Sequence, residues 1–201
     1  ETFFAFQEGR GQWYLMVADG MGTGTLAAQD SQALADLAED LLASGIHPSA
    51  VLRFCSNSLE YSFSAESCCA VDLLCLDPYR CTGELYKLGG APSAMLNGEE
   101  VQFWDNQQLP LGIIGQRNYQ CKTISCSQHS RIYLWSDGMN LPKKVLEPLL
   151  RQLGELSPKA AARRLAELAA QFHGKGDEDD ITIAVLQLHP SSAKDASHRS
   201  N

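Results

Sequence analysis

One stretch of the chain decides the fold, and it reads Val17-Ala18-Asp19-Gly20-Met21-Gly22-Thr23-Gly24. The apolar run that leads into it, residues 13–18, predicts a buried strand. A helical pattern begins directly after it, near Thr25. Asp19 is therefore expected at the end of a strand, on a backbone that glycine bends easily. A carboxylate held there is costly to bury without a partner, and a cation is the simplest partner.

Two other interpretations compete with a cation site. Glycine-rich turns between a strand and a helix also cradle phosphate in dinucleotide-binding folds, but these glycines do not keep the G-x-G-x-x-G spacing. Asp19 would also repel a pyrophosphate unless a metal intervened. The second alternative is a capped turn without chemistry. Metal binding is the interpretation that leads.

The composition is typical of one soluble globular domain. The 201 residues suffice for a sizeable core, and 44% of them are hydrophobic and 20% charged. The net charge of −8 argues against a nucleic-acid partner and suits a site that gathers divalent cations. The seven cysteines contain no C-x-x-C pair and fall mostly in apolar runs, which predicts free thiols in a reducing compartment, the cytoplasm.

The ends of the chain carry expectations of their own. The chain begins at Glu1 without a methionine, so we expect a piece of a longer protein whose preceding part could hold a membrane anchor. No apolar stretch within the chain is long enough to cross a bilayer. We expect one domain over residues 1–189 and a disordered polar tail over residues 190–201.

Apolar periodicity predicts an α+β domain in which sheets are covered by helices on the outside. The closely spaced strands of the middle third favour antiparallel neighbours. Residues 109–115 are apolar but broken by proline and glycines, which predicts a buried connector. The expected strands are residues 3–6, 13–18, 69–76, 82–88, 94–96, 101–104, 119–126, 132–135 and 181–188, and the expected helices begin near Thr25, Pro48, Pro142 and Pro158.

Acidic side chains recur at the ends of apolar strands. The run over residues 132–135 leads into Asp137-Gly138, Asp179-Asp180 precedes the last strand, and Glu1 precedes the first. Taken singly, an Asp-Gly pair is commonly a turn and an acidic run a solvated loop. Taken together, oxygen ligands with no histidine partner nearby select hard ions such as Mg²⁺ or Mn²⁺.

These motifs closely resemble the metal-dependent protein phosphatase (PPM) family, and within it the branch of the sporulation stage II protein E phosphatase domains. Methionine at position 21, where stress-response relatives usually have valine, indicates the branch. The resemblance implies an α-β-β-α sandwich, in which two antiparallel sheets are flanked by helix pairs. It rests on five segments in the family's order, which are residues 17–24, 87–93, 109–114, 135–138 and 179–182.

The same resemblance implies the site residues. Asp19 would bridge two Mn²⁺ or Mg²⁺ ions, and the carbonyl of Gly20 would bind one of them. Asp137 and Asp179 would complete the site, with Asp180 as the ligand if the register shifts by one residue. Glu1 falls where the family usually has a shorter aspartate. Asp19 and Asp137 are the residues expected to carry catalysis.

The implied activity is that of a phosphoserine/phosphothreonine protein phosphatase, with direct hydrolysis by a metal-activated water and no phospho-enzyme. The implied substrate is a phosphorylated anti-sigma-factor antagonist with a STAS fold, in sporulation signalling. Helices over residues 26–62 would take part in switching and in contact between two copies of the chain. The alternative is a catalytically silent, phosphatase-like module that binds a partner, which the glutamate at position 1 motivates.

Overall fold

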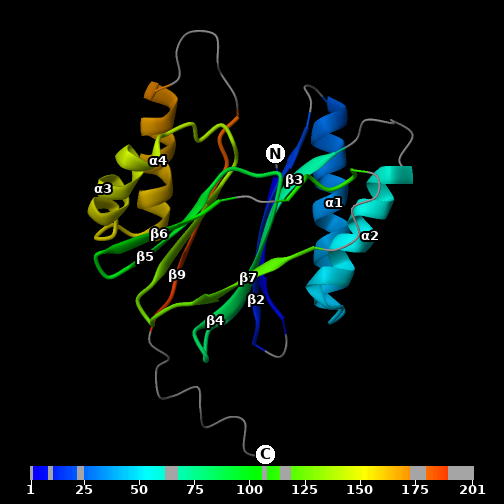
Figure 1. The fold of residues 1–201 in the computed structure, drawn as a ribbon, viewed down its shortest axis with the longest axis horizontal. Coiled ribbons are helices and arrows are strands. Elements are labelled where there is room, and N and C mark those ends of the chain that lie inside the picture. Colours follow the sequence, from blue (N-terminus) through cyan, green and yellow to red (C-terminus); the bar gives the residue numbers. More distant parts are fainter. Residues whose placement is uncertain are drawn as a thin grey trace, which may run out of the picture.

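Two antiparallel sheets and two pairs of helices make up the described part of the chain (Figure 1). The computed structural model describes residues 2–8, 11–21, 25–61, 68–105, 108–113, 119–172 and 180–189. Glu1, Asp179 and the expected tail lie outside these residues. The helices and strands are β1 (Thr2–Gln7), β2 (Trp13–Gly20), α1 (Thr25–Ala43), α2 (Pro48–Tyr61), β3 (Cys69–Asp77), β4 (Thr82–Leu88), β5 (Ser93–Asn97), β6 (Glu100–Trp104), β7 (Cys121–Ser125), β8 (Arg131–Trp135), α3 (Lys143–Leu153), α4 (Pro158–Phe172) and β9 (Ile183–Gln187).

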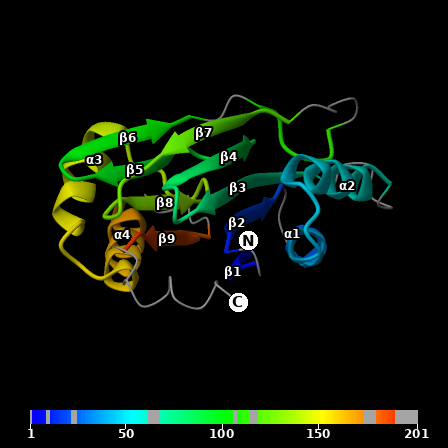
Figure 2. The same cartoon turned by 90° about the horizontal axis from the view of Figure 1, so that it is seen from below.

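The layers follow the order helices, sheet, sheet, helices, as Figure 2 shows. The first sheet has the strand order β1-β2-β3-β4-β7, and the second has the order β6-β5-β8-β9. All of the paired strands are antiparallel. The α-β-β-α sandwich expected from the sequence is therefore confirmed.

The central strands of the first sheet are buried on both faces. Along β2, Tyr14 and Met16 belong to the core beneath α1 and α2, whereas Leu15 and Val17 belong to the core between the sheets. Successive side chains of a strand point to opposite faces, so a strand covered on both sides is apolar at nearly every position. This explains why the run over residues 13–18 shows no alternation.

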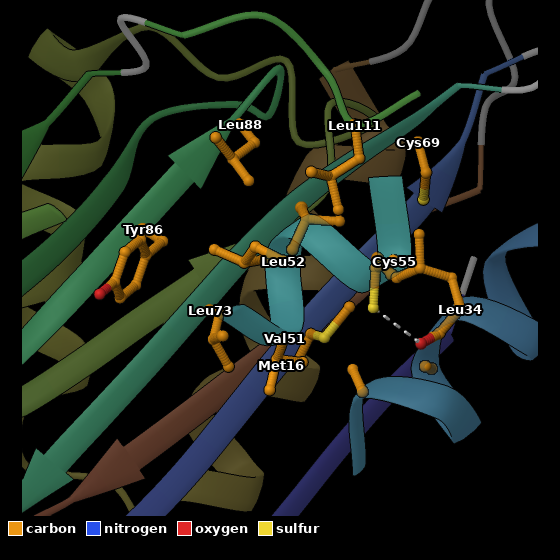
Figure 3. Packing of buried hydrophobic residues seen from close by; sticks show 14 of the residues in the cluster. Met16, Leu34, Val51, Leu52, Cys55, Cys69, Leu73, Tyr86, Leu88 and Leu111 are labelled. Carbon is orange, nitrogen blue, oxygen red and sulfur yellow. Dashed lines mark hydrogen bonds between the residues drawn. The ribbon is translucent and has the colours of Figure 1, made fainter. Parts of the chain in front are cut away.

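The helix pair α1 and α2 packs on the outer face of the first sheet. Figure 3 shows Val51, Leu52 and Cys55 of α2 beside Met16 and Leu73 of the sheet. These five side chains are at most 1% exposed. Burial of an aliphatic side chain contributes about 1.5–3 kcal/mol, so this contact anchors the helix pair on the first sheet.

The second helix pair, α3 and α4, covers the outer face of the second sheet. Leu146, Leu150 and Leu165 are buried there with Tyr133 and Trp135 of β8. The buried guanidinium of Arg131 donates to two carbonyl oxygens at the connection between the helices, at 2.8 Å to Leu153 and 2.7 Å to Leu156. None of the described helices combines the length and the apolar composition that a membrane crossing requires.

Three details differ from the sequence expectations. Strand β2 continues through Asp19 and Gly20, because both residues still pair with β3. Strand β9 covers residues 183–187, fewer than the expected 181–188, and it is half-buried because it is an edge strand of the second sheet. In the expected buried connector, Leu111 is fully buried and forms a bridge to Cys69, but Leu109 is 58% exposed.

Candidate active site

Asp19 and Gly20 occupy the end of β2, where the pairing with β3 holds the backbone. Asp19 lies opposite Ala70 and Gly20 opposite Cys69. One residue further, the amide of Met21 donates to the carbonyl of Cys68 at 2.8 Å. Because side chains alternate along a strand, Asp19 shares the face of Val17, which looks toward the second sheet.

Asp137 follows β8 in a turn that is fastened to the segment before β9. The amide of Ser136 donates to the carbonyl of Thr182 at 3.0 Å, and the amide of Thr182 donates back to Oγ of Ser136 at 3.0 Å. Asp180 lies beside this turn, where its carbonyl accepts from Oγ of Ser136 at 3.4 Å. Asp180, the second residue of the pair Asp179-Asp180, is thereby held at the turn that carries Asp137.

A small cavity between the two sheets joins these two regions. Its volume is about 10 Å³, which is room for about one water molecule. Asp19 reaches it from the first sheet and Asp137 from the second. The lining residues are Val17, Asp19, Ala70, Val71, Asp72, Gly90, Trp135, Ser136 and Asp137.

Of the predicted ligands, the structure thus brings Asp19 and Asp137 to one cavity, with Gly20 next to Asp19 in the chain. Glu1 and Asp179 lie outside the described residues. Within the described ranges, no three His, Cys, Asp or Glu side chains gather closely enough to hold an ion. The ligand roles of all five residues therefore stay predictions. The donors present, two carboxylates and a backbone carbonyl, fit Mg²⁺ or Mn²⁺ in their chemistry.

A buried ion pair lies at the same cavity. Asp72 of β3 and Lys87 of β4 face each other in the ladder, and both side chains are 3% exposed. Nζ of Lys87 donates to Oδ2 of Asp72 at 2.5 Å, to the carbonyl of Ala91 at 2.6 Å and to Oγ of Ser93 at 2.8 Å. Ser93, the first residue of β5, donates in turn to Oδ2 of Asp72 at 2.6 Å. The network connects the two sheets beside the candidate site.

Burial acts on both charges of this pair. Desolvation raises the pKa of the Asp72 carboxyl and lowers the pKa of the Lys87 amine, and the charge of each partner opposes the shift of the other. An ammonium group has three N–H donors, and three acceptors surround Nζ of Lys87. The hydrogen-bond geometry is therefore that of a charged pair.

The thiols near the site have no catalytic signature. Burial, together with the nearby Asp19 carboxylate, raises the pKa of the Cys69 thiol to about 12. A thiol that stays protonated at neutral pH is a poor nucleophile. All seven cysteines are free, in agreement with the sequence expectation.

Sequence reasoning missed the role of Asp72 and its partners. Lys87 and Ser93 lie in a quoted motif, residues 87–93, but had no function assigned. The available signal was a carboxylate in the middle of the apolar strand Cys69–Asp77, because a buried charge requires a partner. The partner itself follows only from the register between β3 and β4.

Known structures share this fold. The PP2C phosphatase domain of the cell fate determinant SpoIIE from Bacillus subtilis, solved with a fragment of its regulatory domain, matches with a TM-score of 0.83 at 22% identity, over 94% of this chain and 58% of that one. RsbX, solved in complex with magnesium, matches with a TM-score of 0.73 at 18% identity, over 93% of this chain and 86% of that one. The fold is that of PP2C-type phosphatase domains.

The family follows from the sequence match. The model of the stage II sporulation protein E (SpoIIE) family matches residues 9–189, and the chain belongs to this family. Stage II sporulation protein E of Bacillus subtilis is 24% identical over 204 residues, which cover 98% of this chain. The match spans only 25% of that relative's length.

Proposed function

We propose that this chain is an Mn²⁺- or Mg²⁺-dependent protein serine/threonine phosphatase domain over residues 1–189. The observation that carries the proposal is that Asp19, in β2 of the first sheet, and Asp137, in the turn after β8 of the second, line one cavity. Membership of the SpoIIE family and the PP2C fold support the same reaction class. RsbX, a structural neighbour, was solved with magnesium, which is consistent with a divalent ion here.

In this proposal the residues of the chain hold and orient the reacting groups. Asp19, the Gly20 carbonyl, Asp137 and Asp179 hold two cations, and Glu1 supplies a further carboxylate. When bound, such cations activate a water and neutralise charge on the phosphoryl oxygens. The paired end of β2 and the turn at Ser136 fix the two carboxylates before substrate arrives, which lowers the cost of orienting them during the reaction.

The proposed substrate is a phosphoserine or phosphothreonine of a protein, and specifically an anti-sigma-factor antagonist with a STAS fold in sporulation signalling. The support for this finer assignment is the family match alone. A phosphorylated STAS-fold protein and a phosphoserine peptide, assayed side by side, test it. Faster dephosphorylation of the folded protein is expected if the domain recognises that fold.

The reaction itself is tested by hydrolysis of p-nitrophenyl phosphate with and without Mn²⁺. We expect manganese-dependent turnover, and a loss of about a hundredfold or more in Asp19→Ala and in Asp137→Ala, because each removes a cation-binding oxygen. Glu167→Gln is the matched control, since Glu167 is an exposed carboxylate of α4 that pairs with Arg163 and Arg164. Equal rates in all four proteins would refute the proposal.

A catalytically silent binding module is the other outcome of that experiment. It would appear as stable binding of the STAS-fold partner without manganese-dependent turnover, also in a chain with the preceding residues added. The carboxylates at the cavity favour the phosphatase hypothesis over the hypothesis of a silent binding module.

Two copies of the domain are proposed to meet through α1 and α2. Phe54 and Tyr61 of α2 are 55% and 84% exposed, which leaves apolar surface on this helix for a partner. Sedimentation of the wild type and of Phe54→Ser tests the contact. A wild-type domain that is monomeric and fully active would count against it.

A further inference from the structure

The carboxylate of Asp72 uses its two oxygens unequally. Oδ2 accepts from both Lys87 and Ser93, whereas Oδ1 is buried and no donor within the described residues reaches it. An unused buried acceptor costs about 1–3 kcal/mol, and most buried polar atoms in proteins are paired. The unequal use therefore calls for an explanation.

The position of Asp72 in the fold offers an explanation for its unpaired oxygen. Asp72 lines the same cavity as Asp19 and Asp137. In the ladder it lies opposite Val17, two residues before Asp19 on the same face of the sheet. Gly90, also in the lining, has no side chain to cover the carboxylate, and a Cβ atom there would lie 3.1 Å from Oδ1.

A purely structural ion pair does not account for this arrangement. Replacing a buried pair with apolar side chains of similar volume is often neutral or stabilising, so stability alone does not require charges here. An ion pair that only joined the sheets would also gain nothing from leaving one oxygen buried and unpaired. The geometry is instead typical of residues that surround the ligands of a metal site. Such residues orient the ligands and their waters by hydrogen bonds.

We propose that Asp72 is a positioning residue of the candidate site, and that its Oδ1 accepts a hydrogen bond from the one water molecule that the cavity has room for, beside the cations. Lys87 and Ser93 fix the other oxygen, so that Oδ1 keeps one direction. This inference rests on the proposed function, and Asp72 itself touches neither the cations nor the phosphoryl group.

The test measures Mn²⁺ affinity by titration calorimetry, beside kcat and KM for p-nitrophenyl phosphate. In Asp72→Asn, the two donors at Oδ2 select the amide oxygen for that place, and the NH₂ group then takes the place of Oδ1. An acceptor facing the cavity becomes a donor while the shape stays the same. We expect Mn²⁺ to bind about tenfold or more weakly.

A second variant separates the loss of the oxygen from a change in net charge. Asp72→Asn leaves the positive charge of Lys87 uncompensated, which by itself repels Mn²⁺. The double variant Asp72→Leu/Lys87→Met removes one charge of each sign, so the net charge is unchanged and the oxygen is still lost. It also decides the question if Asp72→Asn does not fold. Arg131→Met is the matched control, because it removes a buried cation at the other end of β8, about 20 Å along the chain from Asp137.

The outcomes separate the two proposals. Weaker Mn²⁺ binding by about tenfold in the double variant, with affinity within about twofold of the wild type in Arg131→Met, supports the role of Asp72. A double variant that is folded, as thermal melting in chelator shows, and binds Mn²⁺ as tightly as the wild type would overturn it, while the phosphatase proposal stands. A wild type that neither binds Mn²⁺ nor hydrolyses the ester would overturn both.

Discussion

Gly138 lies directly against the backbone of Asp180, and a Cβ atom at position 138 would overlap the carbonyl oxygen of Asp180. This contact joins the turn after β8 to the segment before β9. The hydrogen bonds between Ser136 and Thr182 hold the same two segments. Glycine at 138 is therefore required by the close approach of two backbones, one of which carries Asp137.

Gly138→Ala tests this contact. The added methyl group must displace residues 180 and 181, so we expect a loss of about 1–3 kcal/mol in unfolding free energy. We also expect at least about a tenfold loss of phosphatase turnover, because small displacements of positioning groups are costly. Urea denaturation and ester hydrolysis measure the two effects.

The control for this substitution is Gly98→Ala. Gly98 has a φ of +62° and open space around its Cβ position, so alanine costs about 1 kcal/mol of backbone strain without disturbing the cavity. Turnover should be unchanged in this variant. Wild-type stability and turnover in Gly138→Ala would show that the two segments shift without consequence.

Cation binding should stabilise the domain. A ligand at one hundred times its Kd adds about 2.7 kcal/mol to the unfolding free energy, which for a chain of this size raises Tm by roughly 5–10 °C. Melting curves in Mn²⁺ and in chelator measure the difference. Asp137→Ala should lose most of this shift, and a wild-type Tm that is the same in both conditions would contradict the prediction.

The buried pair between Asp72 and Lys87 predicts non-additive stability. Lys87→Met leaves the Asp72 carboxylate buried without its counter-charge, so we expect a loss of about 3–5 kcal/mol. The double variant Asp72→Leu/Lys87→Met should recover most of this loss, because no unpaired charge remains. Urea denaturation of the wild type, of Asp72→Leu, of Lys87→Met and of the double variant gives the coupling energy, and additive losses would mean that the two residues do not interact.

The half-buried and buried thiols should resist alkylation at neutral pH. Burial raises the pKa of Cys126 to about 11 and that of Cys55 to about 12. At pH 8 only about one Cys126 thiol in a thousand is then ionised, and reaction with iodoacetamide should rise about tenfold per pH unit up to pH 10. Peptide mapping by mass spectrometry measures it, with the urea-unfolded chain as reference. Rapid labelling of Cys55 at pH 8 in the folded protein would contradict the assignment.

Local sequence patterns were enough to predict most of the helices and strands. The expected strand over residues 82–88 matches β4 residue for residue, and the helices begin at Thr25, Pro48 and Pro158 as expected. Turn residues, proline at helix starts and apolar runs act over a few residues, so they can be recognised without the fold. The order of these elements predicted sheets covered by helices on the outside, and the resemblance to the phosphatase family implied the four-layer sandwich.

The tertiary structure decided which side chains meet. Asp19 and Asp137 were candidates from their places at strand ends, but only the packing of the two sheets brings them to one cavity. Asp72 became part of that cavity because the register pairs it with Val17 and Lys87. A shift of one residue would turn it to the opposite face. Register and packing depend on contacts between distant segments, which no local pattern in the chain records.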